Sequence, residues 1–264
     1  MRSIYIGDHT VLATTKLGAK IYVDSRDISI APHLMMEGDW EPAVTNCMVT
    51  FLQRHKGCLF IDVGANVGWY TLLAAHFGAA HVCTFEPNPR LAELLRKTIS
   101  VNGLRERVTL TEAACGAETT KARFIVDPSE NGGGHTASAT PQQALGAALD
   151  GAPQLCDVVR LDDAVKARHL SKGNKLTPII MKVDVEGFEA HVLAGAPEIM
   201  VFEPILFIEH NDGDAEMIRG LQSKGYSIRH VQRTGHPSKV LTLDEAVLVP
   251  FADTLLCVPH GVDT

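Results

Sequence analysis

An acidic residue, two glycines and an asparagine occur in one short stretch of the sequence, at a spacing that suits the binding of a nucleotide. An apolar run that starts at Cys58 reaches Asp62, and Gly64, Asn66 and Gly68 follow at every second position. Gly64 permits a tight turn, Asn66 tolerates a left-handed backbone, and Gly68 lets the following helix pack close to the strand. A buried strand, a glycine turn and a helix N-terminus together predict a nucleotide-binding unit.

The residues around this turn distinguish between the nucleotides that it could bind. The turn lacks the Gly-Lys-Ser/Thr ending of a phosphate-binding loop and does not match the G-x-G-x-x-G fingerprint of dinucleotide binding. Asp62 would repel a pyrophosphate and suits a ligand with positive charge. Glu86 follows Gly68 by 18 residues, at the end of a second apolar run, where a carboxylate hydrogen-bonds a ribose diol. This combination points to S-adenosylmethionine and disfavours an NAD(P)-dependent oxidoreductase of similar topology.

Three blocks of the sequence resemble the FkbM family of S-adenosylmethionine-dependent methyltransferases. The blocks are Phe60–Asn66 (FIDVGAN), Glu86–Asn88 (EPN) and Lys182–Glu189 (KVDVEGFE), in this order over about half of the chain. The resemblance implies an α/β, Rossmann-like class I methyltransferase fold. We therefore expect a seven-stranded, mostly parallel sheet with helices on both faces and an N-terminal cap.

The length of 264 residues fits one domain with additions. We expect a cap at 1–57 and a methyltransferase domain at 58–264, with an insertion loop at about 127–156 near the substrate opening. Glycines 132–134 lie in this loop, which we interpret as a lid. His135 in the same loop is expected to be solvated.

Periodicity and turn residues predict the secondary structure in more detail. The predicted strands of the cap and the sheet are 4–6, 11–14, 20–23, 58–63, 81–85, 107–111, 122–126, 157–161, 177–184, 203–209, 226–232, 245–249 and 254–258. The predicted helices are 40–52, 69–77, 89–101, 214–224 and one that begins near Gly187. The last two strands are expected to form antiparallel edges of the sheet.

Composition excludes several classes of protein. The net charge of −7 and the pI near 5.9 argue against nucleic acid as a partner. The six cysteines show no C-x-x-C spacing and are expected to be buried free thiols in a reducing compartment. The N-terminus has no apolar signal region and no stretch approaches the length of a membrane span, so we expect a cytoplasmic protein without a membrane partner. Self-association through the cap stays open.

The resemblance also implies contacts for the cofactor and the acceptor. It places Glu86, Asn88 and Ala114 beside the cofactor, in addition to Asp62 and the residues of the glycine turn. A glutamate at the start of the helix at 40–52 lies near the active site in the family, which makes Glu41 a substrate-binding candidate.

Three further candidates for contact with the acceptor come from their position in the chain. His33 and Trp40 lie in or near the last loop of the cap, and Glu209 ends the predicted strand 203–209. Each of these side chains has a plain structural alternative, namely packing for Trp40 and solvation or an ion pair for the others.

Methyl transfer to a hydroxyl group requires an aligned nucleophile and a group that removes its proton. His210 is the first candidate for this base, because an unperturbed histidine titrates near neutral pH. Asp184 could orient His210, contact the cofactor, bind the acceptor or take the proton itself, and Glu186 lies next to it. In a regular strand, Glu209 and His210 face opposite ways, so at most one of them faces the crevice.

A divalent metal is a disfavoured alternative. Asp184, Glu186 and Glu209 are oxygen ligands that could hold magnesium and chelate a diol acceptor. Carboxylates at strand ends more often form salt bridges or cap helices, so we predict no required metal.

The sequence therefore predicts an O-methyltransferase that acts on a small molecule such as a sugar, a polyketide or another secondary metabolite. Its cofactor is S-adenosylmethionine and its product S-adenosylhomocysteine. The oxygen acceptor rests on the family resemblance alone. An NAD(P)-dependent oxidoreductase and a non-catalytic cofactor-binding module remain the alternatives.

Overall fold

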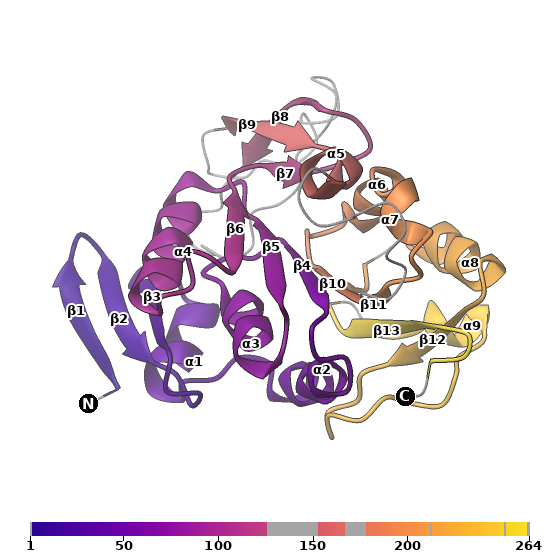
Figure 1. The fold of residues 1–264 in the computed structure, drawn as a ribbon, viewed down its shortest axis with the longest axis horizontal. Coiled ribbons are helices and arrows are strands. Elements are labelled where there is room, and N and C mark those ends of the chain that lie inside the picture. Colours follow the sequence, from indigo (N-terminus) through magenta and orange to yellow (C-terminus); the bar gives the residue numbers. More distant parts are fainter. Residues whose placement is uncertain (1, 126–152, 167–177, 212, 251, 263–264) are drawn as a thin grey trace.

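In the part of the chain that the structure describes, a central seven-stranded sheet has two small three-stranded sheets beside it (Figure 1). The computed structural model describes residues 2–125, 153–166, 178–211, 213–250 and 252–262. Residues 127–152 of the predicted lid, including Gly132 to Gly134 and His135, lie outside these described residues, and its last residues, 153–156, belong to a strand rather than to a loop.

The strands of the central sheet follow the order β12-β13-β11-β10-β4-β5-β6. They are β4 (Leu59–Val63), β5 (His81–Phe85), β6 (Val108–Thr111), β10 (Ile179–Val183), β11 (Ile205–Glu209), β12 (Tyr226–His230) and β13 (Thr254–Pro259). The strands from β6 to β11 pair in parallel, and β13 is antiparallel to both of its neighbours. The predicted mostly parallel sheet is confirmed. The chain continues to opposite sides of β4, so the carboxyl ends of β4 and β10 form the crevice where such sheets bind ligands.

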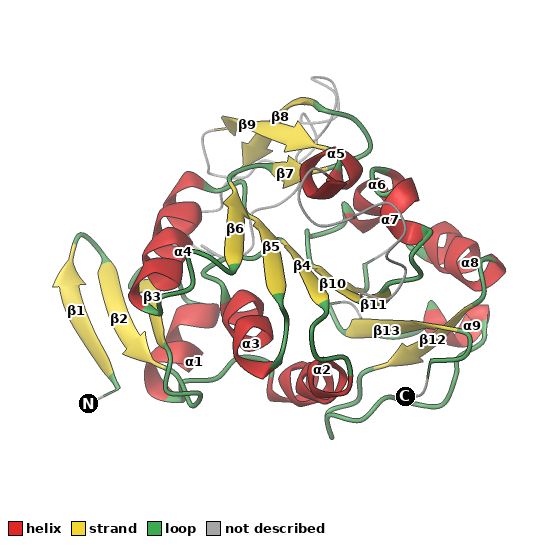
Figure 2. Ribbon diagram, viewed as in Figure 1, coloured by secondary structure: helices red, strands yellow, loops and turns green. Residues whose placement is uncertain are grey.

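Helices cover both faces of this sheet (Figure 2). On one face the core includes α1 (Ile30–Met36), α2 (Pro42–Arg54), α3 (Trp69–Phe77) and α4 (Pro89–Val101). On the other face it includes α5 (Leu161–Lys166), α6 (Glu189–Ala194), α7 (Pro197–Met200), α8 (Ala215–Ser223) and α9 (Leu243–Ala246). Alternate residues of each strand supply the two layers, as Phe60 and Ile61 of β4 do. Burial on both faces explains why these strands are continuous apolar runs in the sequence.

The N-terminal residues form an antiparallel sheet of β1 (Ser3–Gly7), β2 (Thr10–Thr14) and β3 (Lys20–Asp24). Backbone N–H groups of β3 bind side chains of α4 and of its C-cap residue: Tyr22 donates to Thr98 Oγ1 at 3.0 Å, and Lys20 donates to Asn102 Oδ1 at 2.9 Å. Buried side chains of β2 and β3 belong to the same core cluster as those of α3 and α4. This sheet is thus built onto the face of the molecule that carries the glycine turn.

The predicted strand at 245–249 is wrong, because this segment contains helix α9. Thr242 and Glu245 form a capping box in which each side chain accepts the backbone N–H of the other residue. The T-x-x-E pattern was present in the sequence and is typical of a helix start. Helix α1, at 30–36, was not predicted.

The strands predicted at 122–126 and 157–161 form outside the central sheet. They correspond to β8 (Thr120–Ile125) and β9 (Pro153–Val159), which pair with each other, and β9 also pairs with β7 (Ala114–Cys115). Among the described residues, no helix has the length and apolarity that a membrane span requires.

Candidate active site

A cavity of about 310 Å³ opens at the carboxyl ends of β4, β5, β10 and β11. Pockets of this size suit small ligands. Its wall combines residues of the glycine turn and Glu86 with the start of α2 and the carboxylates that follow β10 and β11. The cavity therefore joins the predicted cofactor residues and several of the predicted acceptor residues in one space.

The glycine turn fits tightly against the neighbouring strand. Gly64 has a φ of +80°, and a Cβ atom at this position would lie 1.8 Å from the backbone oxygen of Asp184. The backbone N–H groups of Gly64 and Ala65 both donate to the Phe85 carbonyl, at 3.1 and 3.0 Å. Asn66 has a φ of +53°, as its predicted tolerance of a left-handed backbone requires. Gly64 and Asn66 line the cavity.

Gly68 lies at the end of the turn, where α3 begins. It caps α3 with a φ of +94°, and a Cβ atom there would lie 2.3 Å from Leu95 Cδ1 of α4. Gly68 is not among the residues that line the cavity. Its contact with Leu95 lets α3 and α4 approach each other, so its role toward the cofactor is indirect.

Glu86 is buried, and both of its carboxylate oxygens accept backbone hydrogen bonds. One binds Asn66 N–H at 2.7 Å and the other binds Asn88 N–H at 2.8 Å. Burial raises the pKa of Glu86 to about 7, although these hydrogen bonds oppose the shift. Glu86 lines the cavity, whereas Asn88 does not and instead caps α4 by accepting Arg90 N–H at 3.0 Å. Ala114 lines the cavity between Ala113 and Cys115.

Asp62 lies behind the turn rather than in the cavity wall. Its carboxylate accepts a hydrogen bond of 2.5 Å from the Thr71 hydroxyl of α3. Burial raises the pKa of Asp62 to about 6, and the Thr71 hydrogen bond opposes this shift. The structure thus gives Asp62 a role in fixing α3 against β4, and does not place it in the cavity wall.

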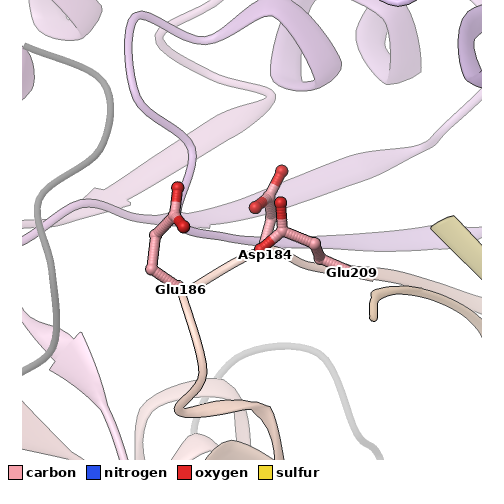
Figure 3. Close-up of side chains that lie close together, drawn as sticks. All are labelled: Asp184, Glu186 and Glu209. Carbon is pink, nitrogen blue, oxygen red and sulfur yellow. The ribbon is translucent and has the colours of Figure 1, made fainter. Parts of the chain in front are cut away.

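Three carboxylates meet at the carboxyl ends of β10 and β11. Oxygen atoms of Asp184, Glu186 and Glu209 all lie within 4.8 Å of one another, and Figure 3 shows the three carboxyl groups turned to the same side. Burial and then the charges of Asp184 and Glu186 raise the pKa of Glu209 to about 9, which keeps it largely protonated at neutral pH. All three residues line the cavity. Such a group could attract a cationic ligand or hold a divalent ion.

Lys182 was not among the predicted site residues, yet it contacts the carboxylate cluster from the core side, through Asp184. Its ammonium Nζ lies 2.7 Å from Asp184 Oδ2 and 5.2 Å from the centre of the Tyr70 ring. Only 1% of the residue is exposed. A lysine inside the apolar run 179–183 was the signal, because a buried strand carries a lysine only where it is paired.

The start of α2 brings two predicted acceptor residues to the cavity. Trp40 and Glu41 line its wall, and Glu41 accepts a hydrogen bond of 2.5 Å from the Tyr70 hydroxyl. Burial raises the pKa of Glu41, and Lys182 opposes this shift. His33 does not line the cavity: its half-exposed ring lies 5.4 Å from that of Trp40 and its Nδ1 3.6 Å from Glu37 Oε1.

His210 does not face the cavity either. The residue is buried, and its Nδ1 lies 3.4 Å from Asp214 Oδ2. Glu209 lines the cavity and His210 does not, in agreement with the expected alternation along the strand. The geometry therefore does not support His210 as the base. It leaves Asp184 and Glu186, which both line the cavity, as the predicted catalytic residues.

The strand order, the glycine turn and the acid at the end of β5 define a Rossmann-like methyltransferase that uses S-adenosylmethionine. The model of the FkbM methyltransferase domain matches residues 62–228, more than half of the chain. The chain belongs to the FkbM methyltransferase family, and its cofactor is S-adenosylmethionine.

One curated relative is the arginine N(omega)-methyltransferase of Streptomyces achromogenes subsp. streptozoticus. It is 35% identical over 80 residues, which cover 30% of this chain and 22% of that protein. The match thus spans about a fifth of the relative's length.

Two solved structures show the range of similar proteins. An O-methyltransferase from Bacillus cereus in complex with SAH is 11% identical over 88% of this chain and 86% of its own, with a TM-score of 0.45. TYW2 of P. horikoshii in complex with MeSAdo is 14% identical over 96% of this chain and 71% of its own, also with a TM-score of 0.45.

Proposed function

We propose that this protein transfers a methyl group from S-adenosylmethionine to a small-molecule acceptor that enters between Trp40 and the ends of β10 and β11. The observation that carries this proposal is the shared cavity. Its wall includes the glycine turn and Glu86 on one side, and Glu41, Asp184 and Glu209 on another. A donor and an acceptor held in one space of this size can reach the in-line geometry of a displacement.

The first acceptor class is a hydroxyl group. Bound S-adenosylmethionine supplies an activated methyl group, whose bond to sulfur breaks with the electron pair left on sulfur. The acceptor oxygen forms the new bond and loses its proton to a carboxylate. Asp184 fits this role, because it lies at the cavity wall next to the cationic Lys182. Glu209, largely protonated at neutral pH, can donate a hydrogen bond to the acceptor.

The second acceptor class is a cationic nitrogen group such as a guanidinium. The three clustered carboxylates favour it, because planar guanidinium groups pair with carboxylates through parallel hydrogen bonds. The name of the Streptomyces relative, an arginine N(omega)-methyltransferase, agrees with this chemistry. A hydroxyl group remains a candidate acceptor, because the same cavity offers a base and a hydrogen-bond donor.

Calorimetry and a transfer assay test the function. We expect the wild-type protein to bind S-adenosylhomocysteine, and Glu86→Ala to lose that binding, whereas Glu106→Ala at an exposed position keeps it. Binding of NAD(H) but not of S-adenosylhomocysteine would overturn the proposal and favour the oxidoreductase.

The acceptor class is decided with S-adenosylmethionine labelled in its methyl group. One panel of sugars and polyketide alcohols and another of arginine and related guanidines are offered in parallel. Label in the first panel supports O-methylation, and label in the second supports N-methylation. Binding without transfer to either panel would leave a cofactor-binding module. Transfer that survives dialysis against EDTA confirms that no metal is needed.

A further inference from the structure

Lys182 interrupts an apolar layer at the centre of the molecule. It is the fourth residue of β10, whose five residues are all buried. Cross-strand pairing places it between Asp62 of β4 and Phe207 of β11. Because side chains alternate along a strand, Lys182 points to the same face as Ile180 and Phe60, the face that α2 and α3 cover. A full positive charge thus lies in the core below the cavity.

Acidic groups and one aromatic ring surround this lysine. Asp184, which directly follows β10, binds Nζ at 2.7 Å, and the Tyr70 ring of α3 lies 5.2 Å away. Glu41 before α2, Glu209 of β11 and Asp62 of β4 interact with it electrostatically. Burial alone would lower the pKa of Lys182, but Asp184, Glu41 and Glu209 raise it above its usual range, so Lys182 stays charged.

The contact between Lys182 and Asp184 links the core to the cavity wall. The Asp184 side chain is 29% exposed and lines the cavity, whereas Lys182 is 1% exposed and does not. Lys182 therefore acts on the cavity through residues of its wall, and its hydrogen bond to Asp184 is the direct polar link. Desolvation of an ammonium group is unfavourable, and only a well-placed partner offsets this cost. Packing alone does not require a charged residue here, since a methionine of similar length would fill the same space.

We propose that Lys182 is a positioning residue for methyl transfer: its buried ammonium group fixes the Asp184 carboxylate at the cavity wall and balances the acidic groups around the acceptor. This inference rests on the proposed function and adds to it a residue that the acceptor never touches. Without Lys182, Asp184 would lose the partner that holds its orientation, and Glu41 and Glu209 would lose the cation with which they interact.

A double-mutant cycle tests the inference with Lys182→Met, Asp184→Asn and the double variant, and with Lys56→Met at an exposed position as the control. We expect Lys182→Met to lower Tm by about 6 to 12 °C, because it leaves buried charge uncompensated. Adding Asp184→Asn should recover at least half of this loss. A Tm of the double variant that falls by the sum of the single losses would show that Lys182 only fills space.

The same variants are compared in binding and turnover with the best acceptor of the two panels. Lys182→Met should bind S-adenosylhomocysteine within about threefold of wild type, since the turn and Glu86 are unchanged, but its kcat should fall at least tenfold with little change in KM. The double variant should be no slower than Asp184→Asn alone. Wild-type kcat in folded Lys182→Met would overturn the inference. Failure of the wild-type protein to bind S-adenosylhomocysteine would instead refute the proposed function. Where Lys182→Met folds poorly, the Tm cycle still tests the inference.

Discussion

Glu86 shows how one residue can shape a site and also contact its ligand. Its two oxygens hold the backbone of Asn66 in the glycine turn and of Asn88 at the start of α4, at 2.7 and 2.8 Å. A carboxylate oxygen has two lone pairs, so each of them can accept a further hydrogen bond from a ribose hydroxyl. The carboxylate is thus already oriented before the cofactor arrives, which lowers the entropy cost of binding.

The raised pKa of Glu86, about 7, makes cofactor affinity depend on pH. In the free protein this carboxyl is mostly protonated at pH 6 and mostly ionised at pH 8, and the ionised form is the better acceptor for a ribose diol. We expect S-adenosylhomocysteine to bind about tenfold more weakly at pH 6 than at pH 8. Calorimetry at both pH values measures this. In Glu86→Gln the affinity should be low and nearly independent of pH, and Glu106→Gln should behave as wild type.

Gly64 gives a second prediction with a matched control. Gly64 and Gly103 both have positive φ, of +80° and +68°, but only Gly64 has a neighbour where a Cβ atom would be, the Asp184 carbonyl at 1.8 Å. We expect Gly64→Ala to abolish binding of S-adenosylhomocysteine, because the turn must move away from β10. Gly103→Ala should bind normally and lose only about 1 kcal/mol of stability. Equal effects of the two changes on binding would contradict this account.

Single residues of the site could be predicted where the backbone dictates them. Gly64 and Asn66 need unusual backbone conformations, and Glu86 follows from its position at a strand end. Lys182 and His210 could not be assigned in this way, because their roles depend on which face of a strand they occupy and on partners that are distant in the sequence. The phase of the alternation decides whether a polar residue reaches the cavity or the core.

At the scale of elements, the start of α2 is joined to the start of α3. Trp69 Nε1 donates to Thr45 Oγ1 at 2.8 Å, and the Thr45 hydroxyl donates to the Trp40 carbonyl at 2.8 Å. Tyr70, the next residue of α3, donates to Glu41. Glu41 also has a φ of +41°, a conformation that costs a non-glycine residue energy and persists only where surrounding contacts hold it. The helix after the cofactor turn therefore positions the two cap residues of the cavity wall.

Tyr70→Phe tests this connection. We expect the loss of the Tyr70 hydroxyl to cost about 1 to 2 kcal/mol in the free energy of unfolding, because Glu41 is left without its donor. Tyr226→Phe is the control: among the described residues, the buried Tyr226 hydroxyl has no hydrogen-bond partner, so its removal should be neutral or slightly stabilising. Urea unfolding of both variants measures the difference. Equal losses would show that the hydrogen bond to Glu41 contributes little.

Elements with a clear period were predicted to within a few residues, and α3 at 69–77 matches its predicted bounds. The error at 245–249 arose because a short apolar segment has no distinct period, and the capping box that decides its structure lies at its edge. The pairing of β7, β8 and β9 apart from the central sheet could not be read from any one of these segments, since pairing is a tertiary property.

At the scale of the whole molecule, the N-terminal sheet is fastened to the rest by a buried carboxylate. Asp24 at the end of β3 accepts hydrogen bonds from Arg90 Nε of α4 at 2.8 Å and from Arg26 Nη2 at 2.8 Å. Its side chain is fully buried. Together with the shared apolar core, this contact makes the predicted boundary at residue 57 a division of the sequence rather than of the packing. We therefore expect residues 2–57 to unfold with the central sheet as one cooperative unit.

Asp24→Asn tests whether this carboxylate holds the N-terminal sheet in place. The direction in which its effect on stability changes with pH follows from the pKa of Asp24. Burial alone would raise the pKa of Asp24, but the hydrogen bonds from Arg26 and Arg90 lower it well below 3.8. Its contribution to stability is therefore complete above pH 4 and is lost as the pH falls below that value. We expect Asp24→Asn to lose about 2 to 3 kcal/mol at pH 7, and a smaller amount at pH 3.

Urea unfolding followed by far-UV circular dichroism and by tryptophan fluorescence measures both the loss and the cooperativity. The two tryptophans, Trp40 and Trp69, both line the cavity, so fluorescence reports on the site and circular dichroism on the whole chain. Coincident transitions that shift together in Asp24→Asn support one unit, with Asp157→Asn in an exposed ion pair as the control that shifts little. A separate early transition in Asp24→Asn that leaves the fluorescence unchanged would instead mean that the N-terminal sheet can detach while the cavity persists. In that case the hydrogen bonds of Asp24 would stabilise the N-terminal sheet alone.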